Sequence, residues 1–303
     1  MEKSIFFRNA LEEIIENANT DEDDDSFYVS DESLLEYSKE FIIAHKTDIP
    51  RLYRYTDADY YSILGLEENT IHLSNIGKMN DVFELLSSVT NDITNNNSHN
   101  DIMSILGNTE KLLQIKSFSE NCASLLMWAT YAKNYSGICV EYDFTKADDF
   151  LLYHLFPVVY RKQRLKKAFL KLAESDFNDY YVNNEECNSD SILDNTVLGL
   201  VKSKSWEYEN EWRLIFNYLH INELYKYAKN DFDNSELFYY DDFTIKTPKP
   251  VAVYLGPRIE NTKRKHIIRI CKNQSIDVFD MKLSDKEFKV EPYTVEYTEL
   301  REE

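Results

Sequence analysis

Residues 115–144, IKSFSENCASLLMWATYAKNYSGICVEYDF, constrain the fold more than any other part of the chain. They begin with a short extended run that ends in Ser117-Phe118-Ser119. In the segment that follows, large side chains recur every three to four residues, the spacing of one helix face: Leu125, Trp128, Tyr131 and Tyr135. Gly137 then predicts the end of this helix, because glycine tolerates a positive φ. Residues 138–143 alternate with the two-residue period of a half-buried strand. The stretch therefore predicts a strand–helix–strand unit with serines at its first corner.

A second informative stretch is WEYENEWRLIF, residues 206–216. Read as one strand, it places its large apolar and aromatic side chains on one side and its charged side chains on the other, namely Glu207, Glu209, Glu211 and Arg213. Like charges two residues apart lie roughly 6.5–7 Å apart and raise one another's pKa unless a cation offsets them. The row is either a solvated face, with Arg213 pairing across it, or a catalytic row.

Charge and composition exclude several classes of protein. The chain carries 54 acidic and 34 basic residues, a net charge of −20, which disfavours binding to a phosphate backbone. No apolar run approaches the ~20 residues that span a bilayer, so we expect no membrane association. The first residues lack the pattern of a signal peptide, and the four cysteines are widely spaced. We therefore expect a cytoplasmic protein with reduced cysteines and no metal site.

Familiar cofactor and catalytic patterns are absent from the sequence. No two of the six glycines form GxG, so the dinucleotide fingerprint and the phosphate-binding loop are both missing. HExxH and GxSxG are missing as well. Any nucleotide must therefore be held by side chains and isolated backbone groups.

The remaining pattern predicts one α+β domain behind a helical extension. Residues 1–46 contain two helical segments and form the extension, and residues 47–303 form the domain. Within the domain, a helical and polar excursion is expected at about 161–197. A strand over Arg51–Tyr55, a short helix ending near Leu64 and a second strand at 71–73 open the domain.

Several segments, in order, resemble a bacterial family catalogued as domain of unknown function 2971. They are LYRYT, SNIGKMNDVFE, SFSE followed by LLMWATYAKNYSGICVEYD, WEYENEWRLI and VYLGP, within residues 50–282. Where the family usually shows Asn-Asp-Pro, this chain has Asn80-Asp81-Val82. The family name itself implies no activity.

The chain also resembles, more distantly, the ADP-ribosyltransferases of the Arg–Ser–Glu type. Those enzymes place an Arg on the first strand, a Ser at a strand-to-helix corner and a Glu in an E/Q-x-E pair. Arg54, Ser117 or Ser119, and the pair Glu209 and Glu211 follow in the same order here. Two departures are Ser-Phe-Ser in place of Ser-Thr-Ser, and three alternating acidic residues in place of two.

This second resemblance implies a mostly antiparallel, split-sheet core with flanking helices and NAD as the substrate. It implies that Glu211 and Glu209 are catalytic, since a carboxylate near the ribose stabilises positive charge that develops as the nicotinamide leaves. Arg54 would clamp the pyrophosphate. The implied NAD-binding set is Arg54, Thr56, Asn80, Ser117, Ser119, Trp128 and Tyr131. The acceptor would be a protein, a nucleic acid or water, as in a toxin-type or phage-defence effector.

Two other readings stay open at the level of sequence. In the first, the chain keeps the fold as a non-catalytic ligand- or protein-binding module, with Arg54 paired to an acidic neighbour and the glutamates facing water. In the second, Asp280-Met281-Lys282 is part of a nuclease strand, although no suitable upstream acidic partner and no basic groove accompany it.

Overall fold

A computed structural model describes residues 2–17, 37–81, 113–163, 196–217, 238–239 and 244–295. The helices are α1 (Glu2–Asn17), the π-helix η1 (Tyr37–Ile43), η2 (Lys46–Asp48), α3 (Tyr60–Glu68), η3 (Ile76–Lys78), α5 (Leu125–Tyr131), η5 (Phe144–Lys146), α6 (Asp149–Tyr153), η6 (Lys204–Glu209) and α10 (Asn261–Gln274). The strands are β1 (Leu52–Thr56), β2 (Thr70–His72), β3 (Ser74–Asn75), β4 (Leu113–Ser119), β5 (Ile138–Tyr142), β6 (Leu155–Pro157), β7 (Val159–Arg161), β8 (Val201–Ser203), β9 (Glu211–Asn217), β10 (Phe238–Tyr239), β11 (Thr244–Lys246), β12 (Ala252–Leu255), β13 (Asp277–Leu283) and β14 (Val290–Thr294). The predicted α+β class is confirmed.

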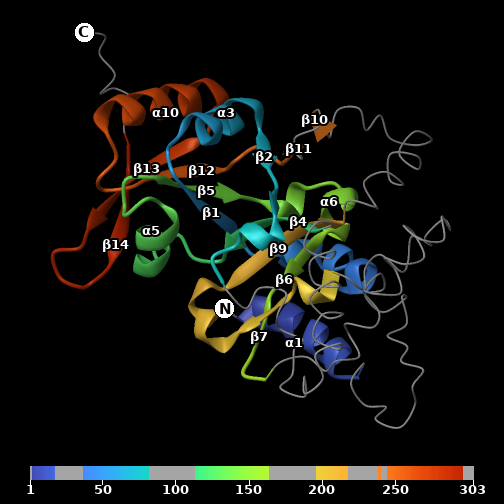
Figure 1. Cartoon of the computed structure of the whole chain (residues 1–303). Coiled ribbons are helices and arrows are strands. Elements are labelled where there is room, and N and C mark those ends of the chain that lie inside the picture. Colours follow the sequence, from blue (N-terminus) through green and yellow to red (C-terminus); the bar gives the residue numbers. More distant parts are fainter. Residues whose placement is uncertain are drawn as a thin grey trace, which may run out of the picture.

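One large sheet organises the molecule (Figure 1). Its strand order is β14-β13-β12-β5-β1-β4-β9-β6, with β3 paired to β4, and every pair is antiparallel except β12 with β13. A three-stranded sheet (β10-β11-β2) and the parallel pair β7-β8 complete the described strands. Helix α5 packs on β1, α10 on β13 and α3, and α1 on β6 and β7.

The sheet splits between β1 and β4. These strands share a single register pair, Tyr53 with Ser119. By contrast, β1 pairs with β5 along its whole length, and β4 does so with β9. Beyond Tyr53 and Ser119, β1 and β4 are therefore held by different neighbours, which leaves a gap in the hydrogen-bond ladder at the centre of the sheet.

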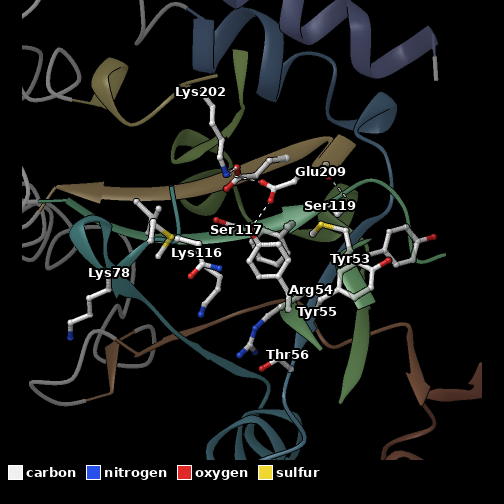
Figure 2. A pocket seen from close by; sticks show the side chains of 17 residues that line it. Tyr53, Arg54, Tyr55, Thr56, Lys78, Lys116, Ser117, Ser119, Lys202 and Glu209 are labelled. Atoms are coloured by element: carbon white, nitrogen blue, oxygen red, sulfur yellow. Dashed lines mark hydrogen bonds and ion pairs between the residues drawn. The ribbon is translucent and has the colours of Figure 1, made fainter. Parts of the chain in front are cut away.

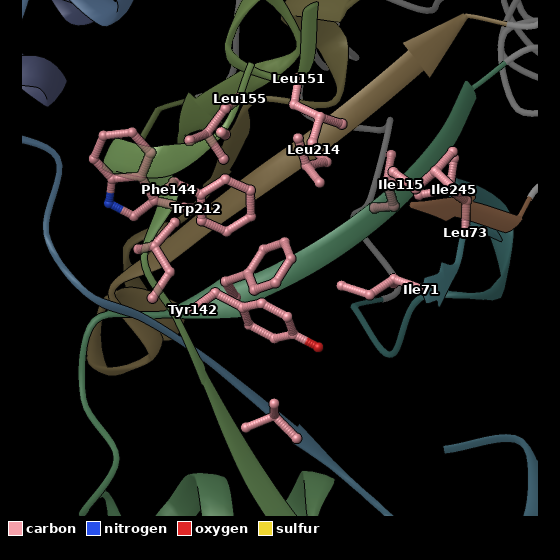
Figure 3. Close-up of a cluster of buried hydrophobic side chains, with 14 of the residues drawn as sticks. Ile71, Leu73, Ile115, Tyr142, Phe144, Leu151, Leu155, Trp212, Leu214 and Ile245 are labelled. Atoms are coloured by element: carbon pink, nitrogen blue, oxygen red, sulfur yellow. The ribbon is translucent and has the colours of Figure 1, made fainter. Parts of the chain in front are cut away.

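The two faces of the sheet are buried by different cores. On one face, Trp212, Leu214, Tyr142 and Phe144 belong to a large cluster, part of which Figure 3 shows. On the other face, Tyr55, Cys139 and Tyr254 pack with Met127 and Trp128 of α5. The alternation predicted for residues 138–143 is present, but both sides of β5 are buried because both faces are covered.

Helix α1 belongs to the main core. Phe7, Leu11 and Ile15 are fully or almost fully buried, and the Phe7 ring meets Trp212 edge-on with centroids 5.4 Å apart. The Tyr37 hydroxyl donates to the Phe7 carbonyl at 2.8 Å. The N-terminal helices expected as an extension thus pack directly on the sheet, because their apolar faces need that cover.

The prediction of one strand over residues 206–216 is wrong. Residues Lys204–Glu209 form the 3₁₀ helix η6, and β9 begins only at Glu211. The Ser203 side chain caps the helix by accepting from the Ser205 amide, and Asn210 ends it with φ at 44°. Asparagine is among the few residues that adopt this left-handed conformation readily. The predicted row of three alternating glutamates therefore does not exist.

The helix predicted around Trp128 ends earlier than expected. Helix α5 stops at Tyr131, and Lys133, Asn134 and Tyr135 have positive φ angles, whereas Gly137 does not. Glycine is needed at 137 for a different reason. A Cβ there would collide with the Thr56 carbonyl at the end of β1. Of the excursion predicted at about 161–197, residues 164–195 lie outside the described residues.

Candidate functional site

A cavity of about 240 Å³ lies at the split between β1 and β4 (Figure 2). Four consecutive residues of β1 and five of β4 line it, so the cavity is open to side chains from both faces of the sheet. Helix α5, the η3 turn, β8 and the start of β9 supply the remaining walls. The lining residues are Tyr53, Arg54, Tyr55, Thr56, Lys78, Met79, Asn80, Ile115, Lys116, Ser117, Phe118, Ser119, Met127, Tyr131, Lys202, Glu209 and Glu211.

Two buried carboxylates form one wall of the cavity, and a lysine joins them. The Lys202 Nζ lies 2.7 Å from Glu209 Oε2 and 3.0 Å from Glu211 Oε2. Arg213 binds both oxygens of Glu211, through Nε at 2.8 Å and Nη2 at 3.1 Å, and donates from Nη1 to the Gly199 carbonyl. Among the described residues, two carboxylates and two cations therefore form a buried network of alternating charge, the arrangement that a low-dielectric site favours.

The two carboxyl groups differ in their electrostatic environment. Burial opposes the ionisation of both. At Glu211 the charges of Arg213 and Lys202 outweigh burial and lower the pKa to about 2. At Glu209 burial outweighs the attraction of Lys202, and the negative charge of Glu211 adds to it, so the pKa of Glu209 is raised. Glu211 is thus a firmly ionised, paired carboxylate, and Glu209 is the more readily protonated of the two.

The serines of the corner hold these glutamates in place. The Ser117 side chain lies beside Glu211 and helps to lower the pKa of that carboxyl. The Ser119 hydroxyl donates to the Glu209 carbonyl at 2.7 Å and accepts from the Asn121 amide at 3.3 Å, and the residue is fully buried. Antiparallel pairing places Ser119 opposite Glu211 across β4 and β9. Both serines line the cavity, and their hydroxyls position the glutamates.

Helix α5 contributes an aromatic wall through Tyr131. Its hydroxyl donates to Glu209 Oε1 at 2.6 Å and is also hydrogen-bonded to Asn80. Burial and the bond to Glu209 raise the pKa of Tyr131 far above its usual value, so the phenol remains a donor. Ser124 caps this helix by accepting from the Met127 amide, which sets the point where α5 begins.

The opposite wall is cationic. Figure 2 shows Arg54 and Lys116 pointing to the same side of the split, away from Lys202 and Glu209. The Thr56 hydroxyl, on the same strand as Arg54, is hydrogen-bonded to Ser62 at 2.8 Å. Burial, and secondarily the Arg54 charge, lower the pKa of Lys116 to about 7. Lys78 adds a third cation at the rim.

Most of the residues expected from sequence meet in this cavity. Arg54, Thr56, Asn80, Ser117, Ser119, Tyr131, Glu209 and Glu211 all line it. Trp128 does not, which corrects its expected role in binding a ligand. The Trp128 side chain is fully buried, its ring packs edge-on against Tyr55, and its Nε1 donates to the Cys122 carbonyl at 2.8 Å. Trp128 faces the core because it lies on the inner side of α5.

Lys202, Lys116 and Lys78 were not anticipated from the sequence. Lys202 comes from β8, which pairs with β7 and is unrelated to any of the predicted segments. Lys116 lies next to Ser117 and would face the other side of an intact sheet, so only the split brings both to one cavity. Neither strand carries a clear signal, because β4 (LQIKSFS) and β8 (VKS) both contain other polar residues beside the lysine.

The residues of the nuclease hypothesis, Asp280 and Lys282, do not line this cavity. Asp280 is bound by Arg264 through two hydrogen bonds, at 3.0 and 2.6 Å, and the Lys282 Nζ lies 4.8 Å from the centroid of the Tyr293 ring. Within the described part of the chain, no group of three His, Cys, Asp or Glu side chains is arranged to hold a metal ion. None of the described helices combines the length and apolar character needed to cross a membrane.

Comparison with family models matches residues 127–214 to the family described as Protein of unknown function (DUF2971). The matched stretch contains most of α5, all of β5, Lys202 and both cavity glutamates. The expected resemblance to this family is therefore supported over residues 127–214. Comparisons with curated proteins and with solved structures gave no match.

Proposed function

We propose that the chain is an ADP-ribosyltransferase-like enzyme that cleaves the bond between nicotinamide and ribose in NAD. The observation that carries the proposal is the meeting of Arg54, Ser117, Glu209 and Glu211, from three distant segments, in one cavity at the split of an antiparallel sheet. Their order along the chain is that of the Arg–Ser–Glu enzymes it resembles.

The distribution of charge in the cavity supports NAD as the ligand. NAD carries a positive nicotinamide ring at one end of a nicotinamide–ribose unit and a pyrophosphate beyond it. The cavity presents carboxylates on one wall and Arg54 with Lys116 on the other. Its volume of about 240 Å³ is slightly below the ~300–1,000 Å³ of pockets that enclose drug-sized ligands. We therefore expect one end of the dinucleotide to be enclosed and the rest to lie at the cavity mouth.

Of the two carboxylates, we assign the larger catalytic share to Glu209. Both oxygens of Glu211 are bound by Arg213, so most of its charge is offset. Glu209 pairs with one cation, Lys202, which it shares with Glu211, and it accepts a hydrogen bond from the neutral hydroxyl of Tyr131. Its charge is therefore better placed to stabilise positive charge on the ribose as the carbon–nitrogen bond breaks.

The raised pKa of Glu209 suits a second role in the same step. The new bond joins the ribose carbon to the oxygen or nitrogen of the acceptor, nicotinamide leaves as a neutral base, and the acceptor loses one proton. Glu209 can take that proton, because a base whose pKa is shifted toward neutrality accepts it more readily. Water is the simplest acceptor, and NAD hydrolysis is then the reaction to be assayed first.

Nicotinamide release, followed by chromatography, tests the proposal. Glu209→Gln is expected to lower the rate at least ~10²-fold, the scale for one preorganised electrostatic group. Glu207→Gln is the matched control, since Glu207 lies on the same 3₁₀ helix but is exposed, pairs with Lys204 and does not line the cavity. Equal rates in wild type and Glu209→Gln would exclude this mechanism.

A second candidate, a non-catalytic binding module, is favoured by the charge balance between Lys202, Arg213 and the two glutamates. A balanced network is stable by itself and needs no catalytic role. If NAD binds to the wild type without any nicotinamide release, this second function is the correct one.

A further inference from the structure

Arg54 and Lys116 form a cationic pair that has no carboxylate partner among the described residues. Within the part of the chain that the structure describes, neither side chain forms an ion pair with an Asp or Glu, and Arg54 lies beside the Tyr142 hydroxyl. This is unusual in a chain with a net charge of −20, where acidic partners are plentiful. Both side chains line the same cavity.

The strand register explains why the two cations lie on the same face of the sheet. Tyr53 lies opposite Ser119, so Arg54 and Thr56 of β1 share a face of the sheet with Lys116 and Phe118 of β4. Between β1 and β4 the sheet is split, and a water-accessible cavity separates the two strands. Two like charges held on one wall of a cavity repel unless an anion offsets them.

We infer that Arg54 and Lys116 together form a subsite for the pyrophosphate of a nucleotide, in which Lys116 is a phosphate-binding residue in its own right. The planar guanidinium of Arg54 can donate two parallel hydrogen bonds to phosphate oxygens, and the ammonium group of Lys116 supplies a compact positive charge. Both kinds of group bind phosphates in proteins. The subsite deepens the proposed function, because it locates the phosphates of the ligand on the wall opposite Glu209.

The state of Lys116 supports this role. Burial and the Arg54 charge bring the pKa of Lys116 to about 7, so the free protein holds this ammonium only partly protonated at neutral pH. A bound phosphate would offset both cations and draw a proton onto Lys116. The ionisable groups that line the cavity with it are Tyr53, Arg54, Tyr55, Lys78, Tyr131, Lys202, Glu209 and Glu211. Binding is then coupled to proton uptake.

Calorimetry with ADP and with inorganic pyrophosphate tests the subsite. Lys116→Met, which removes the charge and keeps the aliphatic stem, is expected to weaken both about 10- to 150-fold, the scale of one hydrogen bond to a charged group. Lys116→Arg should bind within a few fold of wild type. Lys146→Met is the matched control, because Lys146 is exposed and pairs with Asp143 outside the cavity.

Proton uptake separates a direct role from a structural one. In wild type, the binding heat at pH 7.5 should vary with the ionisation enthalpy of the buffer in the sense of proton uptake. In Lys116→Arg this uptake should fall to the contribution of the phosphate's own ionisation, since guanidinium stays protonated. The inference is overturned if wild type binds neither ADP nor pyrophosphate at millimolar concentration. It is equally overturned if Lys116→Met binds both as wild type does.

The outcomes also separate this inference from the proposed function. If ADP binding depends on Lys116 but wild type releases no nicotinamide from NAD, the subsite stands and the enzymatic proposal fails. If nicotinamide is released and Lys116 variants bind ADP normally, the enzyme stands and the subsite fails.

Discussion

At the scale of single residues, the buried network of Lys202, Glu209, Glu211 and Arg213 determines what the site can do. Sequence patterning treats the glutamates as equivalent members of one row. In the structure, Glu211 is bound by two cations and Glu209 by one, so their chemistry differs. The difference arises from Arg213, because Lys202 on β8 contacts both glutamates.

This asymmetry predicts different stabilities for two matched variants. Glu211→Gln removes a carboxylate that binds the buried Arg213 guanidinium through two hydrogen bonds and should lower the free energy of unfolding by ~3–5 kcal/mol. Glu209→Gln should lower the free energy of unfolding by ~1 kcal/mol or less. Lys202 still pairs with Glu211 in this variant, and the raised pKa of Glu209 means that the fold already disfavours its charge. Urea denaturation at pH 7 measures both. Equal losses would contradict the pairing seen here.

Lys116 predicts a pH dependence of stability with a definite sign. Its pKa is about 7 in the folded protein and about 10.5 in the unfolded chain, so between these values the unfolded state binds more protons. The Lys116 contribution to stability therefore rises with pH from about 7 to 10.5, by roughly 2–4 kcal/mol after allowance for partial exposure. Lys116→Met should be more stable than wild type at pH 6.5 and lose this advantage by pH 10. A constant difference would show that Lys116 has an ordinary pKa.

At the scale of elements, the strand–helix–strand unit of residues 113–142 holds the site together. Strand β4 carries the serines and Lys116, α5 carries Tyr131, and β5 supports β1 along its length. Trp128 fixes α5 to the sheet through its contacts with Tyr55 and the Cys122 carbonyl.

Trp128→Ala should therefore lower the free energy of unfolding by ~3–5 kcal/mol, the cost of truncating a large buried aromatic side chain. A denaturant melt provides the measurement. Leu126→Ala on the same helix is the control, since Leu126 is 56% exposed and should change stability by less than ~0.5 kcal/mol. A loss below ~1 kcal/mol for Trp128→Ala would mean that this face of α5 is not the core.

The existence and type of the central elements could be predicted from periodicity, but the site could be predicted only in part. Strand β5 and helix α5 follow from spacing, and β1 follows from its aromatic and long side chains. The boundary at Asn210 could not be predicted from the sequence. A short run that alternates aromatic and acidic residues looks the same in a strand as in a 3₁₀ helix followed by a strand. The cationic wall requires the split, which is a property of strand pairing and is invisible in local sequence.

At the scale of the whole molecule, α1 is part of the core that packs on the sheet, and it also contacts the start of β9 next to the cavity. Arg8 forms an ion pair with Glu120 at 2.6 Å and donates to the carbonyls of Val158 and Glu211. The helix thus supports the residues at which β9 begins.

Removal of residues 1–17 should therefore prevent stable folding. Phe7, Leu11 and Ile15 each contribute ~1.5–3 kcal/mol by burial, a sum comparable to the ~5–15 kcal/mol that keeps a typical domain folded. Circular dichroism and thermal melting of the truncated chain would show this. A cooperative melt near the wild-type temperature would mean that the helix is a dispensable extension.

Binding of NAD to the full chain, measured by calorimetry, tests the central claim most directly. We predict that wild type binds NAD and that Arg54→Ala weakens binding by ~1.5–3 kcal/mol, or about 10- to 150-fold. Arg51→Ala, which removes an arginine that pairs with Asp143 outside the cavity, should bind as wild type does. The absence of binding heat from wild type at millimolar NAD, or equal affinity in Arg54→Ala, would contradict the assignment of this cavity to NAD.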